Sequence, residues 1–327
     1  MTDSVHSEKS AASDQLVSLP RFLDLLRCPA SDAPITLSPD RRSLRSPDQQ
    51  YAISHDGIPV FAESLLSAEA RQQQAHYDRI AETYLTNLSY PHTIEYMKYL
   101  DRELLNAIGG AQLNTVAEIC CGHGESFKLI GSKVDRGVGV DISLGMLRKA
   151  REEHALPNLL FVQGDATRLP LASEAFDHIF MLGGIHHVND RAALFAEVHR
   201  VLKPGGSFIY REPVSDFFVW RALRAVVYRL SPALDHVNER PLRLVETVPV
   251  LEEAGLRSVH WKTHGFLGFC LFMNSDVLVF NRAFQYLPGI GALTRFATTV
   301  DAWTLRVPGL GGAGLQVIGK ATKGKPQ

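Results

Sequence analysis

The chain has 327 residues, of which 45% are hydrophobic and 21% are charged, and its 34 basic residues nearly balance its 35 acidic residues. This is an ordinary globular composition, long enough for one large α/β domain with additions or for two modest domains. The neutral balance gives no electrostatic argument for a nucleic-acid partner, which would favour a basic surface. We therefore expect no nucleic acid among its partners.

The cysteines and the apolar stretches bear on the cellular compartment. Cys28, Cys120, Cys121 and Cys270 lack the regular spacing of a disulfide framework, which indicates a reducing compartment. Residues 1–15 are polar, without the apolar core of a signal peptide, and are expected to be disordered. The most apolar later stretch is shorter than the roughly 20 residues of a membrane span. We expect a cytoplasmic protein.

The chain before residue 111 divides into two parts. Residues 16–64 form a small leader with an apolar helical start, a polar middle and the segment YAISHDGIPVF. Residues 65–110 show apolar side chains at helical spacing, with a second helix from Thr93 to Ile108 that Gly109 ends.

Residues 111–213 change to a strand–helix rhythm. Short apolar runs, each followed by a helical segment or a turn, cover 115–120, 137–142, 159–165, 176–182 and 206–212. Alternation of this kind predicts an α/β fold with a parallel sheet and helices on both faces. Strands buried on both faces also explain why these runs are continuously apolar.

The pattern loosens over 214–327. Helices are predicted at 217–230 and 243–255 and two late strands at 257–264 and 315–322, which brings the expected sheet to seven strands. Between the late strands lies an apolar insert, 265–313, punctuated by Gly and Pro. The insert is either a lid or a homodimer interface.

The first predicted strand ends in Glu118-Ile-Cys-Cys-Gly122-His-Gly124. Glycines at a strand-to-helix turn let the backbone approach a ligand closely. A dinucleotide fingerprint would add a third glycine where Phe127 stands. The motif alone is shared by several nucleotide-binding folds.

Acidic residues end the next two strands. Asp141 follows the second strand, where a carboxylate can accept the hydroxyl protons of a ribose. Asp165 follows the third, where it can accept from an adenine amino group. The fourth strand ends in LGGIHHV, which includes His186 and His187.

Five segments in this order, VAEICCGHGE, GVDIS, GDATRLP, FDHIFMLGGIHHV and RVLKPGG, resemble the class I S-adenosylmethionine-dependent methyltransferases. They look most like the branch that includes the ubiquinone/menaquinone methyltransferases. The resemblance implies a Rossmann-like seven-stranded sheet with a helical cap and a core at 111–213. It also implies S-adenosylmethionine as cofactor, S-adenosylhomocysteine as product and no metal.

The resemblance assigns cofactor contacts by position. Glu118 would orient the methionine amino group, Asp141 would hold the ribose and Asp165 the adenine amino group. The further contacts that it implies are Cys120, Gly122, His123, Gly124, Ile142, Met146, Gly164, Ala166, Leu182 and Gly183. The family commonly has Thr or Ser where His123 stands, a departure that bears on contacts at the sulfonium.

The leader resembles the zinc-ribbon-like segment that precedes some methyltransferase domains. Its four ligand positions would be Cys28, Ser31, Ser46 and Gln49. One thiolate is too few for a tetrahedral zinc site, so we expect this leader to keep its shape without metal.

Several residues near the expected sheet edge are candidates for catalysis. His186 or His187 would act as a general base; the alternative is that both are structural. Arg211 would bind an acidic acceptor, or would only form a salt bridge. In this family the helices of 65–110 often cover the site, so Tyr77 or Tyr84 would contact substrate unless it only packs between helices.

We predict a methyltransferase that acts on a bulky, partly apolar or aromatic small molecule at an O, C, N or S atom. One alternative is a protein that binds S-adenosylmethionine for other chemistry or for regulation. Another is an RNA or protein methyltransferase, which the neutral charge disfavours. The basic apolar helix with Arg221, Arg224 and Arg229 allows contact with a membrane surface, but packing as a cap helix is the commoner outcome.

Overall fold

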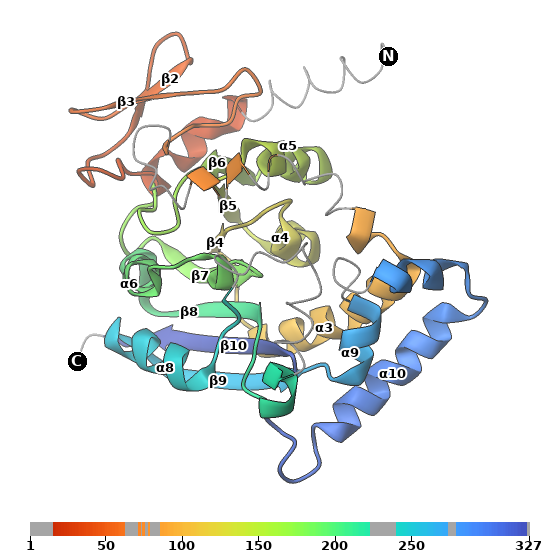
Figure 1. Cartoon of the computed structure of the whole chain (residues 1–327). Helices are drawn as coiled ribbons and strands as arrows, with labels where there is room; N and C mark the ends of the chain where they lie inside the picture. The colour runs from red at the N-terminus through yellow and green to blue at the C-terminus, as the bar shows by residue number, and fades with distance from the viewer. Residues whose placement is uncertain are drawn as a thin grey trace.

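The structure, a computed structural model, describes residues 16–62, 71–72, 74–75, 78, 86–222, 240–273 and 279–325 (Figure 1). Its centre is a seven-stranded sheet with the order β6-β5-β4-β7-β8-β10-β9, in which only β10 runs antiparallel to its neighbours. The strands are β4 (Thr115–Ile119), β5 (Arg136–Asp141), β6 (Leu159–Gln163), β7 (Phe176–Leu182), β8 (Leu202–Pro213), β9 (Leu256–His264) and β10 (Gln316–Lys323). The predicted Rossmann-like fold is confirmed.

The strand positions agree with the apolar runs to within two residues, except at the start of β8. This strand was expected from residue 206 but begins at Leu202, directly after the preceding helix. Leu202 already pairs with Phe176, and the register then shifts before His178 pairs with Ser207. The Lys-Pro-Gly-Gly helix stop therefore lies inside the strand as an irregularity.

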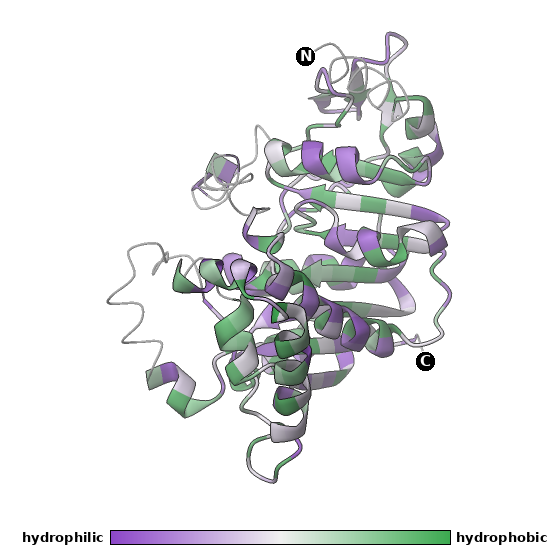
Figure 2. Ribbon diagram, turned by 90° about the vertical axis from the view of Figure 1, so that its right-hand side faces the viewer, coloured by the Kyte–Doolittle hydropathy of each residue, from purple (hydrophilic) through white to green (hydrophobic). Residues whose placement is uncertain are grey.

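Helices cover both faces of the sheet. The first face carries α6 (Arg191–Val201) and α8 (Leu244–Glu253), and the second carries α3 (Pro91–Ile108), α4 (Glu125–Ile130) with the turn η2 (Gly131–Lys133), and α5 (Leu144–Glu153). Alternate strand residues divide between the two apolar clusters: Ile179 of β7 belongs to the first, and Phe180 belongs to the second. Figure 2 shows the apolar colour along these strands.

The leader packs on the free edge of the sheet. It consists of η1 (Leu19–Leu25) and an antiparallel sheet of β1 (Thr36–Leu37), β2 (Ser43–Arg45) and β3 (Gln50–Ala52). Val60 pairs in parallel with Gln163 of β6, and the Gln163 side chain accepts the Ala62 N–H at 3.0 Å. An edge strand that would otherwise present unpaired backbone groups is thereby covered.

Three of the positions that the sequence resemblance compared to zinc ligands, Cys28, Ser31 and Ser46, lie in a polar cluster with Tyr51. Cys28 Sγ lies 2.9 Å from the Tyr51 hydroxyl. Burial raises the pKa of Cys28, but hydrogen bonds from Ser31, Tyr51 and Ser46 outweigh it and bring the pKa down to about 7. Within the described ranges, no group of three or more His, Cys, Asp or Glu side chains is placed to hold a metal ion.

The insert is more helical than its Gly and Pro content suggested. It forms α9 (Leu267–Met273), η4 (Val279–Tyr286) and α10 (Ile290–Thr304), which pack against α3 in a third apolar cluster. The buried carboxylate of Asp301 accepts the Tyr96 hydroxyl at 2.6 Å and the backbone N–H groups of Phe266, Gly268 and Phe269 at about 3 Å. One side chain of α10 thus joins α3 to the start of α9.

One predicted helix is seen in part, and several other predictions concern residues outside the described ranges. The helix predicted at 217–230 is seen over 218–222, and its remainder lies outside the described residues, as do residues 1–15, Tyr77 and Tyr84. No helix in the described part of the chain is both long and apolar enough to cross a membrane.

Gly319 of β10 lies at a tightly packed point of the sheet. It pairs with Tyr210 of β8, whose ring occupies the space that a Cβ on Gly319 would need. We predict that Gly319→Ala lowers the free energy of unfolding by about 1–3 kcal/mol, the usual effect of overpacking. Urea unfolding measures this. Gly110→Ala is the control, because no atom lies near its Cβ position; equal stabilities of the two variants would contradict the packing described here.

Candidate active site

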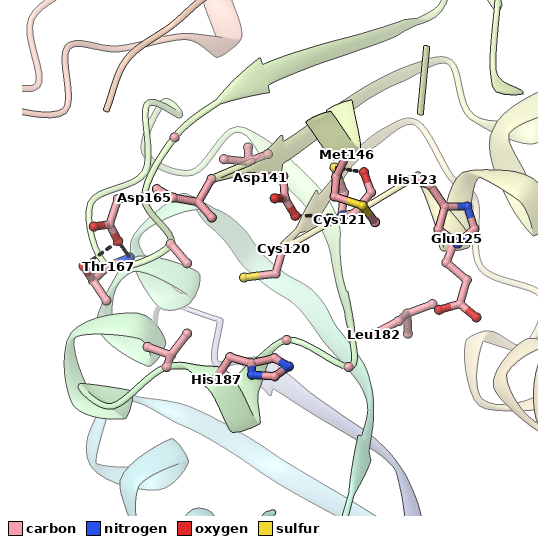
Figure 3. A pocket seen from close by; sticks show the side chains of 18 of the residues that line it. Cys120, Cys121, His123, Glu125, Asp141, Met146, Asp165, Thr167, Leu182 and His187 are labelled. Atoms are coloured by element: carbon pink, nitrogen blue, oxygen red, sulfur yellow. Dashed lines mark hydrogen bonds between the residues drawn. The ribbon is translucent and has the colours of Figure 1, made fainter. Parts of the chain in front are cut away.

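A cavity of about 410 Å³ opens where β4, β5, β6 and β7 end (Figure 3). Ligands of open α/β sheets bind at this edge, and the volume is in the usual range for a small-molecule site. Most of the predicted contacts line it, namely Cys120, Gly122, His123, Asp141, Ile142, Met146, Gly164, Asp165, Ala166, Leu182, Gly183 and His187. Figure 3 shows Asp141 and Asp165 on one side of the cavity and His187 across from them.

The loop after β4 is bent by unusual backbone angles. Cys120 has φ of 50° and Gly122 has φ of 52°, a backbone region that residues other than glycine rarely adopt. Such strain costs of order 1–3 kcal/mol and is typical of ligand-binding loops. Gly184, after β7, approaches this loop so closely that a Cβ on it would lie 2.6 Å from Cys120 Cβ. A larger residue at position 184 would therefore collide with Cys120 and displace the two loops that line the cavity.

Asp141 ties the ends of two strands together. Its Oδ2 accepts the Gly122 N–H at 2.8 Å, and its Oδ1 accepts the Ser143 N–H at 2.9 Å. Burial raises its pKa above the usual range, although these N–H groups favour the charged form. A carboxylate has about four acceptor sites, so each oxygen can still accept a hydroxyl of a ligand in the cavity.

Asp165 is held by its own turn. Its Oδ1 accepts the Thr167 N–H at 2.8 Å and the Thr167 hydroxyl at 2.7 Å. These bonds fix one carboxylate oxygen within the chain. The residue lines the cavity beside Ala166, so it can accept a hydrogen bond from a ligand there.

Two predicted contacts, Gly124 and Glu118, do not line the cavity. Glu118 is buried in β4. Its Oε1 accepts the Ser126 N–H at 2.7 Å, while among the described residues its Oε2 has no partner although it is buried. Burial raises the pKa of Glu118 to about 8. A buried acid with an unused acceptor oxygen suits a cationic donor in the neighbouring site.

The two histidines have different positions. His187 lines the cavity, whereas His186 turns toward Glu212, with its Nδ1 2.8 Å from Oε2. Their rings lie 3.8 Å apart, centroid to centroid. Glu212 also accepts the N–H groups of Gly184 and Ile185, at 2.7 and 2.8 Å. This buried carboxylate therefore fixes the turn η3 (Ile185–His187) that carries both imidazoles.

Arg211 lies outside the cavity lining. Its buried guanidinium pairs with Asp101 of α3 at 3.0 Å and also with Glu125 of α4, and Glu125 does line the cavity. The ion pairs connect helix α3 to the wall of the site. Tyr77, the remaining catalytic candidate, lies outside the described residues.

Sequence reasoning missed several lining residues, which are Cys121, Glu125, Val140, Thr167, Gly184, Val188, Asn189 and Asp190. A signal existed for Cys121, Glu125 and Thr167, because they closely follow the ends of predicted strands. No such signal marks Val140, which lies inside a predicted strand, or Asn189 and Asp190, which come several residues after one.

The family model that this chain matches covers the residues that line the cavity. Residues 117–210, which include most of β4, all of β5 to β7 and most of β8, match the family model described as a methyltransferase domain. The matched segment is similar to a methyltransferase domain. It contains all the residues named above that line the cavity.

The chain is also similar to curated methyltransferases. The phthiotriol/phenolphthiotriol dimycocerosates methyltransferase of Mycobacterium tuberculosis is 34% identical over 42% of this chain and 51% of its own length. The demethylmenaquinone methyltransferase of Renibacterium salmoninarum is 31% identical over 40% of this chain and 58% of its own. The chain thus spans about half the length of the curated relatives that it matches.

Solved structures share the fold at low identity. An S-adenosylmethionine-dependent methyltransferase from Thermotoga maritima superposes with a TM-score of 0.52 at 18% identity, over 76% of this chain and 99% of its own. The [4+2]-cyclase SpnF superposes with a TM-score of 0.55 at 15% identity, over 79% of this chain and 97% of its own. At such low sequence identity, the similarity shows a shared fold and nothing about the reaction.

The buried Glu118 predicts a pH dependence of stability. Its pKa is about 8 in the folded protein, against an ordinary 4.5, so the folded state binds the extra proton between these values. Stability from this group is therefore present below pH 4.5 and is lost as the pH rises toward 8. Glu118→Gln removes this effect, so its Tm should fall less between pH 5 and 8 than the Tm of the wild type. The difference should be about 2–4 °C for each kcal/mol of pH-dependent stability that is removed.

The matched control is Glu152→Gln, an exposed carboxylate on α5. Thermal unfolding followed by circular dichroism at several pH values gives the comparison. An equally steep fall in Tm for Glu118→Gln and the wild type would show that Glu118 ionises normally in the folded protein.

Proposed function

We propose that this chain binds S-adenosylmethionine in the cavity and transfers its methyl group to a bulky, partly apolar small molecule. The observation that carries the proposal is the pair of carboxylates, Asp141 and Asp165, at the ends of neighbouring strands beside a strained glycine loop. Both lie in the segment that is similar to a methyltransferase domain.

The chain's own residues fit the parts of this cofactor. Asp141 would accept both ribose hydroxyls and Asp165 the adenine amino group, with Ala166 beside the ring. The loop 120–124 would lie under the methionyl end, and the spare oxygen of Glu118 would attract its ammonium group. When bound, S-adenosylmethionine supplies a methyl group already activated on a sulfonium. The protein then mainly has to align the acceptor and exclude water.

We assign the general base to His187. It lines the cavity on the side away from the two carboxylates, where an acceptor hydroxyl, thiol or carbon acid would lose its proton. His186 and Glu212 hold the turn that presents it. In this assignment Arg211 positions Glu125 and α3 and does not contact the acceptor.

The apolar character of the acceptor is inferred from two sources. The curated relatives are named for dimycocerosates and for demethylmenaquinone. In this chain, the apolar residues Ile142, Met146, Leu182 and Val188 form part of the cavity wall. A quinone-like, polyketide-like or lipid-linked molecule has the matching chemistry.

Asp141→Ala tests the cofactor site. Loss of two hydrogen bonds to a charged acceptor should weaken binding of S-adenosylhomocysteine by about 100-fold or more. Isothermal titration calorimetry measures the Kd. Asp135→Ala, an exposed aspartate just before β5, is the control and should bind as the wild type does. A folded Asp141→Ala variant with unchanged affinity would contradict the proposed site.

His187→Ala separates catalysis from binding. Without the base, turnover should fall by about 100-fold or more while the Kd of S-adenosylhomocysteine stays unchanged. Turnover is followed as S-adenosylhomocysteine formed in the presence of a bacterial lipid extract. Loss of cofactor affinity in this variant would assign His187 to the cofactor, and unchanged turnover would exclude it as the base.

A further inference from the structure

Helix α10 has an outward stripe of large apolar side chains. Leu293, Phe296, Val300 and Trp303 follow one another at spacings of three or four residues and are 51%, 67%, 41% and 68% exposed. The opposite side of the helix, which includes Asp301, is buried against α3 and α9. The helix is therefore anchored on one side while apolar residues face outward on the other.

The exposed stripe continues into the segment before the helix. Tyr286 and Leu287, just ahead of α10, are 80% and 47% exposed. We call these six residues the insert face. Single exposed apolar residues need no explanation, but a set of six that includes three aromatic rings marks an interaction surface. Figure 2 looks onto this side of the molecule, where apolar residues recur along the helices.

The charges around the insert face are mostly basic. Residues 279–313 contain the three arginines Arg282, Arg295 and Arg306 and a single acidic residue, Asp301, which is buried. Arg295 pairs with Glu95 of α3 at 3.1 Å, and Lys98 shares the same carboxylate. Over residues 279–313 positive charge therefore exceeds negative charge, which would favour an anionic partner.

Topology places the insert at the ligand edge of the sheet. β9 runs parallel to β4–β8 and the antiparallel β10 runs back, so the insert leaves and re-enters the sheet where the parallel strands end. The cavity opens at this same edge.

We propose that the insert face docks on the surface of an anionic lipid bilayer. Aromatic rings such as Trp303 and Tyr286 suit the headgroup region, aliphatic side chains suit the acyl boundary, and arginines pair with phosphate groups. A second copy of the chain fits less well, because a twofold interface would bring the arginines of both copies together. Docking would bring the ligand edge near molecules dissolved in the membrane, a consequence that rests on the proposed function.

The test is co-sedimentation of the full chain with vesicles of phosphatidylcholine mixed with phosphatidylglycerol, and with vesicles of phosphatidylcholine alone. The wild type should bind the mixed vesicles more tightly, and added salt should weaken this binding. Phe296→Ser with Trp303→Ser should lower the partition coefficient by about tenfold or more. The matched control is Leu244→Ser with Val245→Ser, which removes two exposed apolar residues from α8.

Vesicle binding by the wild type that the double variant loses, with its Tm unchanged, supports the proposal. A wild type that does not bind the mixed vesicles overturns it, and so does a double variant that binds as well as the control. Light scattering that shows a dimer dissolved by the same substitutions, without vesicle binding, would assign the insert face to a second copy. This assay needs no cofactor, so its failure is distinguishable from failure of the methyltransferase proposal.

Discussion

One hydrogen bond, from the Gly122 N–H to Asp141 Oδ2, joins the loop after β4 to the end of β5. It holds a backbone that is strained at Cys120, and it leaves acceptor sites of the same carboxylate directed at the cavity. The sheet makes this possible, because parallel neighbours bring both strand ends to one edge. In our account, binding of the cofactor depends on this constraint.

The sheet and most of the cavity lining were predictable because their signals are local. Continuous apolar runs revealed the strands, and glycine or acidic residues at the strand ends, such as Asp141 and Asp165, indicated the site. Contacts between distant residues gave no such signal. Asp301 binds the start of α9 from more than 30 residues away, and Gln163 binds Ala62 from 101 residues away. The helical cap or insert was expected, but its anchoring by Asp301 and the covered sheet edge were visible only in the structure.

The fold alone does not determine the reaction. A cyclase shares the architecture as well as a methyltransferase does, so function has to be argued from the site. Here Glu212 gathers the backbone of the turn after β7 and the ring of His186, which places His187 on the cavity wall. The apolar insert face at the same edge of the sheet fits an acceptor that resides in a membrane.

The most direct measurement of methyl transfer uses S-adenosylmethionine labelled in its methyl group, the purified chain and a bacterial lipid extract. Our account predicts that label enters the organic phase in equal amount to the S-adenosylhomocysteine released. Binding of S-adenosylmethionine without transfer to this extract, or to a panel of quinols and phenols, would contradict it. The chain would then be a protein that binds the cofactor without transferring its methyl group.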